Sequence, residues 1–169
     1  MKRLTKIERY MELAKTVSIG CTCFRIRIGA IIVGKDDQVV ATGYVGAPRK
    51  IMDCFGHGFC LRNKLNIPAG HRYELCRSVH AEMNCIINAA RTGVSTIGGD
   101  LYLYGHREPD KILMDMAPCF FCKRIIINAG INKVFCSTKS GKIKVYKVAD
   151  WVKEWQIRDI IEDQVQYGK

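Results

Sequence analysis

The sequence predicts a three-layer α/β/α fold with a mixed central sheet of about five strands. One observation is the length of 169 residues, which suits one domain with a sizeable core. Another is the composition, 48% hydrophobic and 25% charged, which is typical of a globular protein. The third is the order of the patterns along the chain: helix, strand, strand, helix, strand, helix and strand. We therefore expect residues 1–169 to form a single domain.

The first helix and the first two strands have clear local signals. Thr5 and Glu8 have the spacing of a capping box, and apolar residues follow with a helical period to about Ser18. The stretches 26–33 and 39–44 are rich in β-branched residues and are separated by a polar turn, so each is predicted to be a strand. A helix and a two-stranded hairpin should therefore open the fold.

The middle of the chain is less regular. Prolines, glycines, cysteines and histidines are mixed through residues 45–79, and a loop of this length usually has a function or is held by a staple. Residues 83–90 then carry apolar positions with a helical period, and this helix should end near Gly93. A short strand is predicted at 101–104, followed by a loop at 106–117.

The last third continues the alternation. A helix is expected over 119–128, before Gly130, and a strand over 133–137. Residues 141–148 are expected to add one more strand. A final helix, packed on the body of the protein or on another subunit, is predicted from the helical spacing of Trp151, Trp155 and Val165.

Two short motifs carry side chains suited to a metal. His80 and Glu82 stand at the start of the helix in the middle of the chain. Cys119 and Cys122 follow Pro118 at the start of the next helix, where cysteines three apart share one face. An imidazole and two thiolates are good zinc ligands, and two helix N-termini would stabilise the thiolates. Three protein ligands leave a fourth position for water, which is the pattern of a catalytic zinc site.

Two simpler interpretations of these residues are open. A Cys-x-x-Cys pair with a distant histidine also occurs in purely structural zinc sites. Glu82 could serve only as an acidic residue that complements the dipole at the start of a helix. The combination of both motifs favours the catalytic interpretation, because a structural site has no need of a carboxylate beside its histidine.

The chain carries a formal net charge of +11, which suggests anionic partners, either phosphate-bearing small molecules or nucleic acid. A surface that is simply rich in lysine would give the same charge. No stretch approaches the ~18 apolar residues of a membrane span, and the N-terminus lacks the apolar core of a signal peptide. Nine cysteines in such a chain indicate metal binding and reduced thiols more than disulfides. We therefore expect a cytoplasmic protein that does not enter a membrane.

His-x-Glu followed by Pro-Cys-x-x-Cys is the signature of zinc deaminases that act on cytosine or adenine bases. The chain also resembles the dCMP (deoxycytidylate) deaminase branch of the zinc-dependent cytidine deaminase superfamily over most of its length. This combined match is more specific for the superfamily than for the branch. The stretches that carry the resemblance are 23–25, 28–33, 41–44, 46–48, 67–70, 74–77, 80–84 and 123–131.

The resemblance implies a cytidine-deaminase-like fold and the hydrolytic deamination of a cytosine nucleotide, first of all dCMP to dUMP and ammonia. It assigns His80, Cys119 and Cys122 to a zinc ion that acidifies water, and Glu82 to proton transfer. The backbone N–H of Ala81 or that of Glu82 is expected to help hold the pyrimidine. Relatives of this kind are commonly homo-oligomers, from dimers to hexamers, that dCTP with Mg²⁺ activates and dTTP inhibits. We expect a small-molecule nucleotide substrate, within pyrimidine nucleotide metabolism.

This sequence departs from the branch at two positions. Val45 stands where the branch usually has an asparagine that contacts the sugar of the substrate. Lys50 stands where a glycine is usual. Because a valine side chain neither donates nor accepts a hydrogen bond, we expect sugar recognition here to differ from that of the branch.

The irregular stretch and its surroundings carry a second candidate metal site. Some relatives bind a structural zinc in this region, and a closed four-ligand site could staple the loop. Alternatively, the cysteines are buried free thiols that pack as small hydrophobic side chains. The candidate ligands are Cys23, Cys54, Cys60 and Cys76, with His57 and His71 as alternatives. The remaining thiols, Cys21, Cys85 and Cys136, are expected to lie in the core.

Three arginines are candidates for binding a substrate phosphate, because guanidinium groups suit phosphate oxygens. They are Arg25, Arg27 and Arg77, and each could instead be a surface side chain. His106, in the predicted loop after the third strand, is expected to be a solvated histidine.

The sequence is also compatible with two other functions. One is deamination of a base in RNA or DNA, or of another small heterocycle, which the net charge and Val45 favour. The other is a zinc-stapled nucleic-acid-binding module without turnover, against which the intact Glu82 argues. Salt dependence separates a nucleotide from a polynucleotide partner, because binding of a polynucleotide falls steeply with salt.

Overall fold

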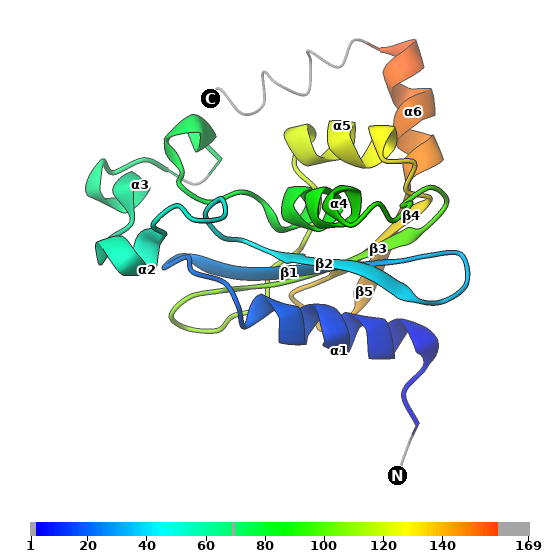
Figure 1. Cartoon of the computed structure of the whole chain (residues 1–169), viewed down its shortest axis with the longest axis horizontal. Coiled ribbons are helices and arrows are strands. Elements are labelled where there is room, and N and C mark those ends of the chain that lie inside the picture. Colours follow the sequence, from blue (N-terminus) through cyan, green and yellow to red (C-terminus); the bar gives the residue numbers. More distant parts are fainter. Residues whose placement is uncertain (1–2, 69, 159–169) are drawn as a thin grey trace.

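The computed structural model describes residues 3–68 and 70–158, and it contains a five-stranded sheet in the order β2-β1-β3-β4-β5. The strands are β1 (Ile26–Val33), β2 (Val39–Tyr44), β3 (Asp100–Arg107), β4 (Lys133–Ser137) and β5 (Ile143–Lys147). Helix α1 (Lys6–Ser18) covers one face of this sheet, and α4 (Ala81–Arg91) and α5 (Phe120–Asn128) cover the other (Figure 1). The predicted three-layer α/β/α fold with a mixed five-stranded sheet is therefore confirmed.

Strand β3 lies between β1 and β4 and gives the sheet its mixed character. β1 pairs antiparallel with β2 and with β3, whereas β3 and β4 are parallel. β5 returns antiparallel to β4 at the other edge. A parallel pair needs a crossover connection, which α5 supplies here. This helix lies on the same face of the sheet as α4 (Figure 1).

Both faces of the sheet are packed against apolar helix surfaces. On the α1 side, Tyr10, Met11 and Ala14 contact a cluster in which the rings of Tyr102 and Phe135 stack at 4.6 Å between centroids. The larger core lies on the other side, and fully burying one of its large aliphatic side chains contributes about 1.5–3 kcal/mol. This core therefore fixes α4 and α5 on the sheet. Its fully buried members include Ile32, Leu101, Leu103, Ile126 and Val134.

Several elements begin and end where the sequence predicts. The side-chain oxygen of Thr5 accepts a hydrogen bond from the backbone N–H of Glu8, and the Glu8 carboxylate accepts one from the backbone N–H of Thr5. This is the predicted capping box, and the helix ends at Ser18 as expected. The bounds of β1, β2 and β4 also agree with the predictions.

The third strand is longer than the predicted 101–104, and it changes the setting of His106. β3 extends to Arg107, because its last residues pair with β1, where Arg27 stands opposite His106. The side chain of His106 is 14% exposed, and its Nε2 atom lies 3.4 Å from the carboxylate of Glu108. The expectation of a solvated loop histidine is therefore wrong.

The stretch 45–79 contains short elements that its composition does not predict. They are α2 (Cys54–His57), α3 (Leu61–Lys64) and the 3₁₀ turn η1 (Tyr73–Leu75). The final helix is α6 (Val148–Ile157), in which Trp151 is buried against the core. Val165, which the sequence also assigns to this helix, lies outside the described residues.

Gly43 lets β2 approach α4 closely. A β-carbon on Gly43 would stand 2.3 Å from the backbone nitrogen of Cys85 and 2.6 Å from the carbonyl oxygen of Ala81. Gly43→Ala should therefore destabilise the fold by about 3 kcal/mol, because backbone atoms of the helix would have to shift. Denaturant unfolding measures this loss. Thr42→Ala, at the exposed neighbouring position, should cost less than about 1 kcal/mol, and equal losses in the two variants would contradict the close approach.

Candidate metal centre

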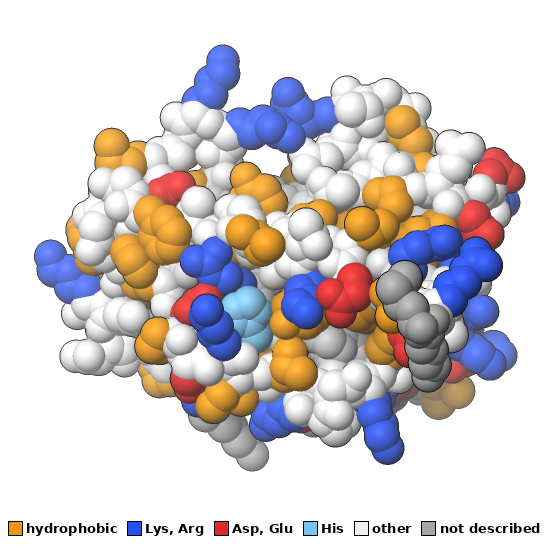
Figure 2. All heavy atoms as spheres, turned by 90° about the horizontal axis from the view of Figure 1, so that it is seen from below, with side chains coloured by type: hydrophobic (Ala, Val, Ile, Leu, Met, Phe, Trp, Pro, Cys, Tyr) orange, Lys and Arg blue, Asp and Glu red, His pale blue; other side chains and the backbone are white. Residues whose placement is uncertain are grey.

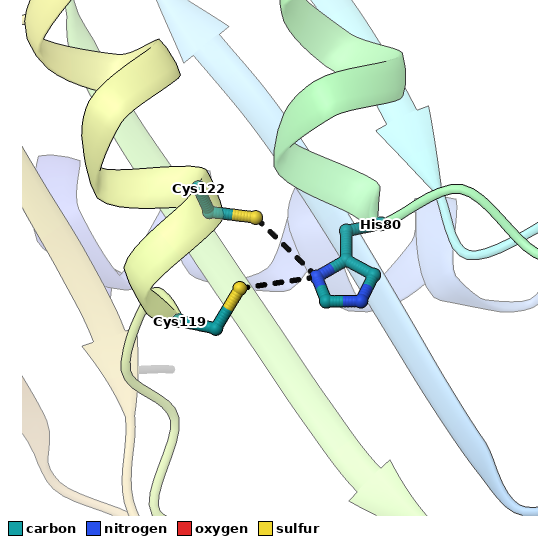
Figure 3. Close-up of side chains that lie close together, drawn as sticks. All are labelled: His80, Cys119 and Cys122. Atoms are coloured by element: carbon teal, nitrogen blue, oxygen red, sulfur yellow. Dashed lines mark hydrogen bonds between the residues drawn. The ribbon is translucent and has the colours of Figure 1, made fainter. Parts of the chain in front are cut away.

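Three side chains from the starts of α4 and α5 meet at one point. His80 is the N-cap residue of α4, Cys119 is the N-cap residue of α5, and Cys122 lies in the first turn of α5. Both sulfur atoms lie 3.4 Å from Nδ1 of His80 and point toward it (Figure 3). The structure thus brings together the imidazole and the two thiols that the motifs propose as ligands.

The spacing of these three atoms fits a tetrahedral zinc ion. Zn–S bonds of ~2.3 Å and Zn–N bonds of ~2.0 Å at the tetrahedral angle place sulfur and nitrogen about 3.5 Å apart. The observed separations are 3.4 Å. Within residues 3–68 and 70–158, no other group of three or more histidine, cysteine or acidic side chains has all its ligand atoms within 4.8 Å of one another. For His80 to bind a metal through Nδ1, the proton of its neutral ring must be on Nε2.

The two thiols differ in acidity because they share a buried site. A hydrogen bond from Cys122, helped by the nearby His80, lowers the pKa of Cys119 to about 4. The same pairing raises the pKa of Cys122, because the proton stays on that sulfur. The hydrogen bond with Cys119 also raises the pKa of His80. A thiolate is therefore already favoured at Cys119 without a metal, which suits a zinc site because only the deprotonated sulfur is a ligand.

Glu82 is buried beside these ligands, in the first turn of α4, with 5% of its surface exposed. Burial raises the pKa of its carboxyl group, and the nearby His80 acts in the opposite direction. A carboxyl group with a raised pKa is suited to accept and release protons near neutral pH. Ala81, between Glu82 and His80, is fully buried.

A cavity of about 250 Å³ opens next to the centre, and His80, Glu82 and Cys119 form part of its wall. Val45, which is 4% exposed, also lines this cavity. The position that departs from the branch therefore faces the site with an apolar side chain. Further apolar wall residues are Ile26, Ile28, Met114 and Met116.

Lys50, the other departure, lies in the loop after β2, and its backbone has a φ of 67°. Glycine adopts this left-handed conformation readily, whereas a residue with a β-carbon is strained there. A glycine would therefore suit this position better than the lysine that occupies it.

The four cysteines proposed for a second metal line the same cavity. In the described part of the chain they do not form a compact ligand set like that of the first centre. Neither of the alternative ligands, His57 and His71, lines the cavity. The thiols assigned to the core, Cys21, Cys85 and Cys136, are at most 2% exposed.

The structure separates the three candidate arginines. Arg25 lines the cavity, whereas Arg77 does not, and the guanidinium of Arg77 lies 4.6 Å from the centre of the Phe59 ring. Arg27 forms an ion pair of 2.6 Å with Glu108. Of the three, only Arg25 is placed where it could contact a ligand in the cavity.

Arg62 and Tyr73 also line the cavity, although no pattern in the sequence singles them out. The ring of Tyr73 lies edge-on to the ring of His80, at 5.2 Å between centroids. Both residues belong to the irregular stretch, where no periodicity distinguishes inward from outward side chains. Arg62 differs from the candidate arginines in being buried, and its burial cannot be read from the sequence.

The starts of two helices bring together an imidazole, two thiols and a buried carboxylate, which are the side chains of the zinc deaminase signature. The chain belongs to the cytidine and deoxycytidylate deaminase family, because the model of the family's zinc-binding region matches residues 4–138. The family match and the three clustered ligands together support zinc as the metal.

Several relatives carry the dCMP deaminase name. The deoxycytidylate deaminase of Saccharomyces cerevisiae is 32% identical over 128 residues, which are 76% of this chain and 36% of the relative. That of Mycobacterium phage D29 is 31% identical over 132 residues, which are 75% of this chain and 90% of the relative. The solved dCMP deaminase of cyanophage S-TIM5 in its apo form has a TM-score of 0.56 and 26% identity, and the match covers 82% of this chain and 86% of that one. The chain spans about a third of the length of the yeast relatives.

Proposed function

We propose that the protein is a zinc-dependent hydrolase that deaminates dCMP to dUMP and releases ammonia. The observation that carries this proposal is the buried carboxylate of Glu82, which shares one cavity with His80 and Cys119. A structural zinc site needs no carboxylate there, whereas deamination needs a group that moves protons. The names of the relatives support dCMP as the substrate. A second structure of the cyanophage enzyme contains dCMP and dUMP.

In this proposal His80, Cys119 and Cys122 would hold zinc, which would supply Lewis acidity and lower the pKa of a water molecule to ~7. Glu82 accepts a proton from that water and delivers it to ring N3, while the water oxygen bonds to C4. Glu82 then transfers the second proton to the amino group, and the C4–N bond breaks to release ammonia. The backbone N–H of Ala81 holds the pyrimidine in place. Burial suits Glu82 to this role, because it raises the pKa of the carboxyl group.

A mononucleotide suits the site better than a polynucleotide. The cavity has a volume of about 250 Å³, which favours a small ligand. On the face seen from the side of α1, basic side chains are scattered among apolar and acidic ones (Figure 2). A protein that binds a polynucleotide usually gathers its lysines and arginines into a stripe or patch. On this face, therefore, the net charge of +11 is not gathered into such a patch.

The proposal is tested by incubating the purified, zinc-loaded protein with dCMP, CMP, deoxycytidine, dCTP and a short single-stranded oligonucleotide. Ammonia release should be fastest with dCMP and should depend only weakly on salt. Turnover of the oligonucleotide that falls steeply with salt would instead indicate a deaminase of nucleic acid. Release of no ammonia from any of these compounds would contradict the proposal and favour a zinc-stapled binding module.

We also propose a second, structural zinc ion in the same region. Its four candidate ligands line one cavity, and burial raises the pKa values of Cys23 and Cys54, to which the neighbouring candidate thiols add a smaller repulsion. Metal analysis of the wild-type protein should therefore find one zinc more per chain than analysis of Cys54→Ser. That variant should keep its catalytic zinc. Equal zinc content in the two proteins would rule out the second ion. The ligands would be Cys23, Cys54, Cys60 and Cys76.

Further proposals concern the domain organisation, assembly, regulation and location of the protein. From the resemblance we propose a single domain over residues 1–169 and a homo-oligomer, with dCTP and Mg²⁺ as activators. Size-exclusion chromatography with and without dCTP and Mg²⁺ tests the assembly. All nine cysteines are free, which suits a cytoplasmic location. Within the described residues, the helices lack the length and apolar character needed to cross a membrane.

A further inference from the structure

Arg62, in α3, is a buried charge without an acidic partner. It is 6% exposed, and one of its terminal nitrogens donates hydrogen bonds to the carbonyl oxygens of Pro68 at 2.6 Å and His71 at 2.7 Å. Its Nε atom is buried and has no hydrogen-bond partner among the described residues. Arg62 also takes no part in the ion pairs of residues 3–68 and 70–158. An unpaired buried charge is costly, so this guanidinium lacks an anion.

A second guanidinium lies beside the same segment. Arg25 donates to the carbonyl oxygen of Ile67 at 3.4 Å, next in the chain to the carbonyl of Pro68 that Arg62 contacts. Both arginines line the cavity that contains Glu82. Two like charges held at consecutive carbonyl groups repel each other, and an anion bound between or beside them would offset this repulsion.

The nearby carboxylates do not supply this anion. Asp115 lines the cavity, but its carboxylate accepts a hydrogen bond of 2.9 Å from the backbone N–H of Lys139 and lies 3.8 Å from that side chain's nitrogen. Glu74 is exposed and pairs with Arg72, which lowers its pKa more than Arg62 does. Among the described residues, the guanidinium groups of Arg25 and Arg62 at the cavity therefore have no acidic partner.

We infer that Arg62, together with Arg25, binds the 5′-phosphate of the substrate, and that Arg62 is a residue that determines specificity for a nucleotide over a nucleoside. This inference rests on the proposed function. A guanidinium presents planar, forked donors that match phosphate oxygens, and its unused Nε–H is available for one of them.

The position of Arg62 relative to the metal centre fits this role. Its guanidinium lies 4.6 Å from the centre of the Tyr73 ring, and the centre of the His80 ring lies 5.2 Å from the centre of the same ring. One aromatic side chain therefore contacts both the guanidinium proposed for the phosphate and a ligand of the metal centre. A base at Glu82 and a phosphate at Arg62 would be joined by the sugar, which would lie along the cavity wall.

The competing explanation is that Arg62 only fastens the loop that contains Pro68 and His71. A fastening role predicts that removal of the guanidinium affects deamination of dCMP and deoxycytidine to the same extent. Phosphate binding predicts that only the phosphorylated substrate is affected. The ratio of the two kcat/KM values therefore distinguishes the explanations even if the variant is less stable.

The experiment compares the wild type, Arg62→Gln and Arg62→Lys with dCMP and with deoxycytidine. Arg62→Gln should lower kcat/KM for dCMP about 10- to 100-fold, mainly through KM, and should change that for deoxycytidine less than about threefold. Arg62→Lys keeps the charge and should recover part of the loss. Arg77→Gln is the matched control, because Arg77 also contacts an aromatic ring and donates to a backbone carbonyl, at Phe59, but lies outside the cavity lining. It should leave the ratio of the two kcat/KM values unchanged.

Binding of inorganic phosphate, measured by calorimetry, gives a readout that needs no turnover. The wild type should bind phosphate at least about tenfold more tightly than Arg62→Gln does. Equal phosphate affinity in the two proteins, or an equal loss with both substrates, would overturn the inference. If Arg62→Gln does not fold, the same two measurements, the ratio of kcat/KM values and the affinity for phosphate, are made with Arg62→Lys and Arg25→Gln. If the wild type deaminates neither substrate, the proposed function fails, whereas a dCMP deaminase whose selectivity survives Arg62→Gln contradicts only this inference.

Discussion

Glu82→Gln should lower the rate of deamination by about 10⁴-fold while zinc stays bound. The amide has the size of the carboxyl group, so the cavity keeps its shape, but the amide cannot carry a proton from water to the base. One group serves both transfers in the proposed reaction, so its loss affects every chemical step. Ammonia release at saturating dCMP, together with the zinc content of the same sample, measures the effect.

Asp115→Asn is the matched control for this result, because Asp115 is the other carboxylate in the wall of the cavity. Its carboxylate is engaged with Lys139, so the amide should cost less than about tenfold in rate. The unfolding temperature of Glu82→Gln should not fall, because a neutral amide replaces a buried acidic group. A Glu82→Gln protein that turns over dCMP at the normal rate would refute the assignment of Glu82.

Cys122→Ser should remove the catalytic zinc and with it the activity. Cys122 is fully buried, and its sulfur lies 3.4 Å from Nδ1 of His80. A serine hydroxyl does not ionise near neutral pH and is a poor zinc ligand, so affinity for zinc should fall more than about 100-fold. Zinc retained after dialysis against a chelator, measured in the variant and in the wild type, gives the result.

Cys136→Ser separates loss of a ligand from loss of a buried thiol. Cys136 is also fully buried, in β4, and lies outside the ligand set. Its replacement by serine buries a hydroxyl group at a similar cost in stability, but zinc should remain. If Cys136→Ser lost as much zinc as Cys122→Ser, the effect would be general destabilisation, and the assignment of Cys122 as a ligand would lose its support.

Much of the centre can be predicted from the sequence because its ligands stand at helix ends. His80 and Cys119 each mark the position where an apolar helical period begins, so a local pattern locates both. The sheet can be predicted for a similar reason. Its inner strands, such as β1 and β4, are apolar runs bounded by turns, and their side chains are buried by helices or neighbouring strands.

Other features depend on contacts between distant segments and leave no local pattern. The end of β3 is polar, and His106 belongs to a strand only because β1 pairs with it. Arg62 looks like a surface residue in an irregular stretch, and it is buried because the segment with Pro68 and His71 accepts its hydrogen bonds. The shared cavity of the four cysteines likewise depends on how the stretch 45–79 packs against the sheet.

The insertion of β3 between β1 and β4 has a consequence for the order of assembly. His80 precedes β3 in the chain and Cys119 follows it, so the pairing of β3 in the sheet helps to bring the two ligands together. Both of its pairings join segments that are distant along the chain, and such contacts form slowly. We therefore expect zinc to bind after the sheet has formed. Removing the ion and adding it back should leave the sheet folded.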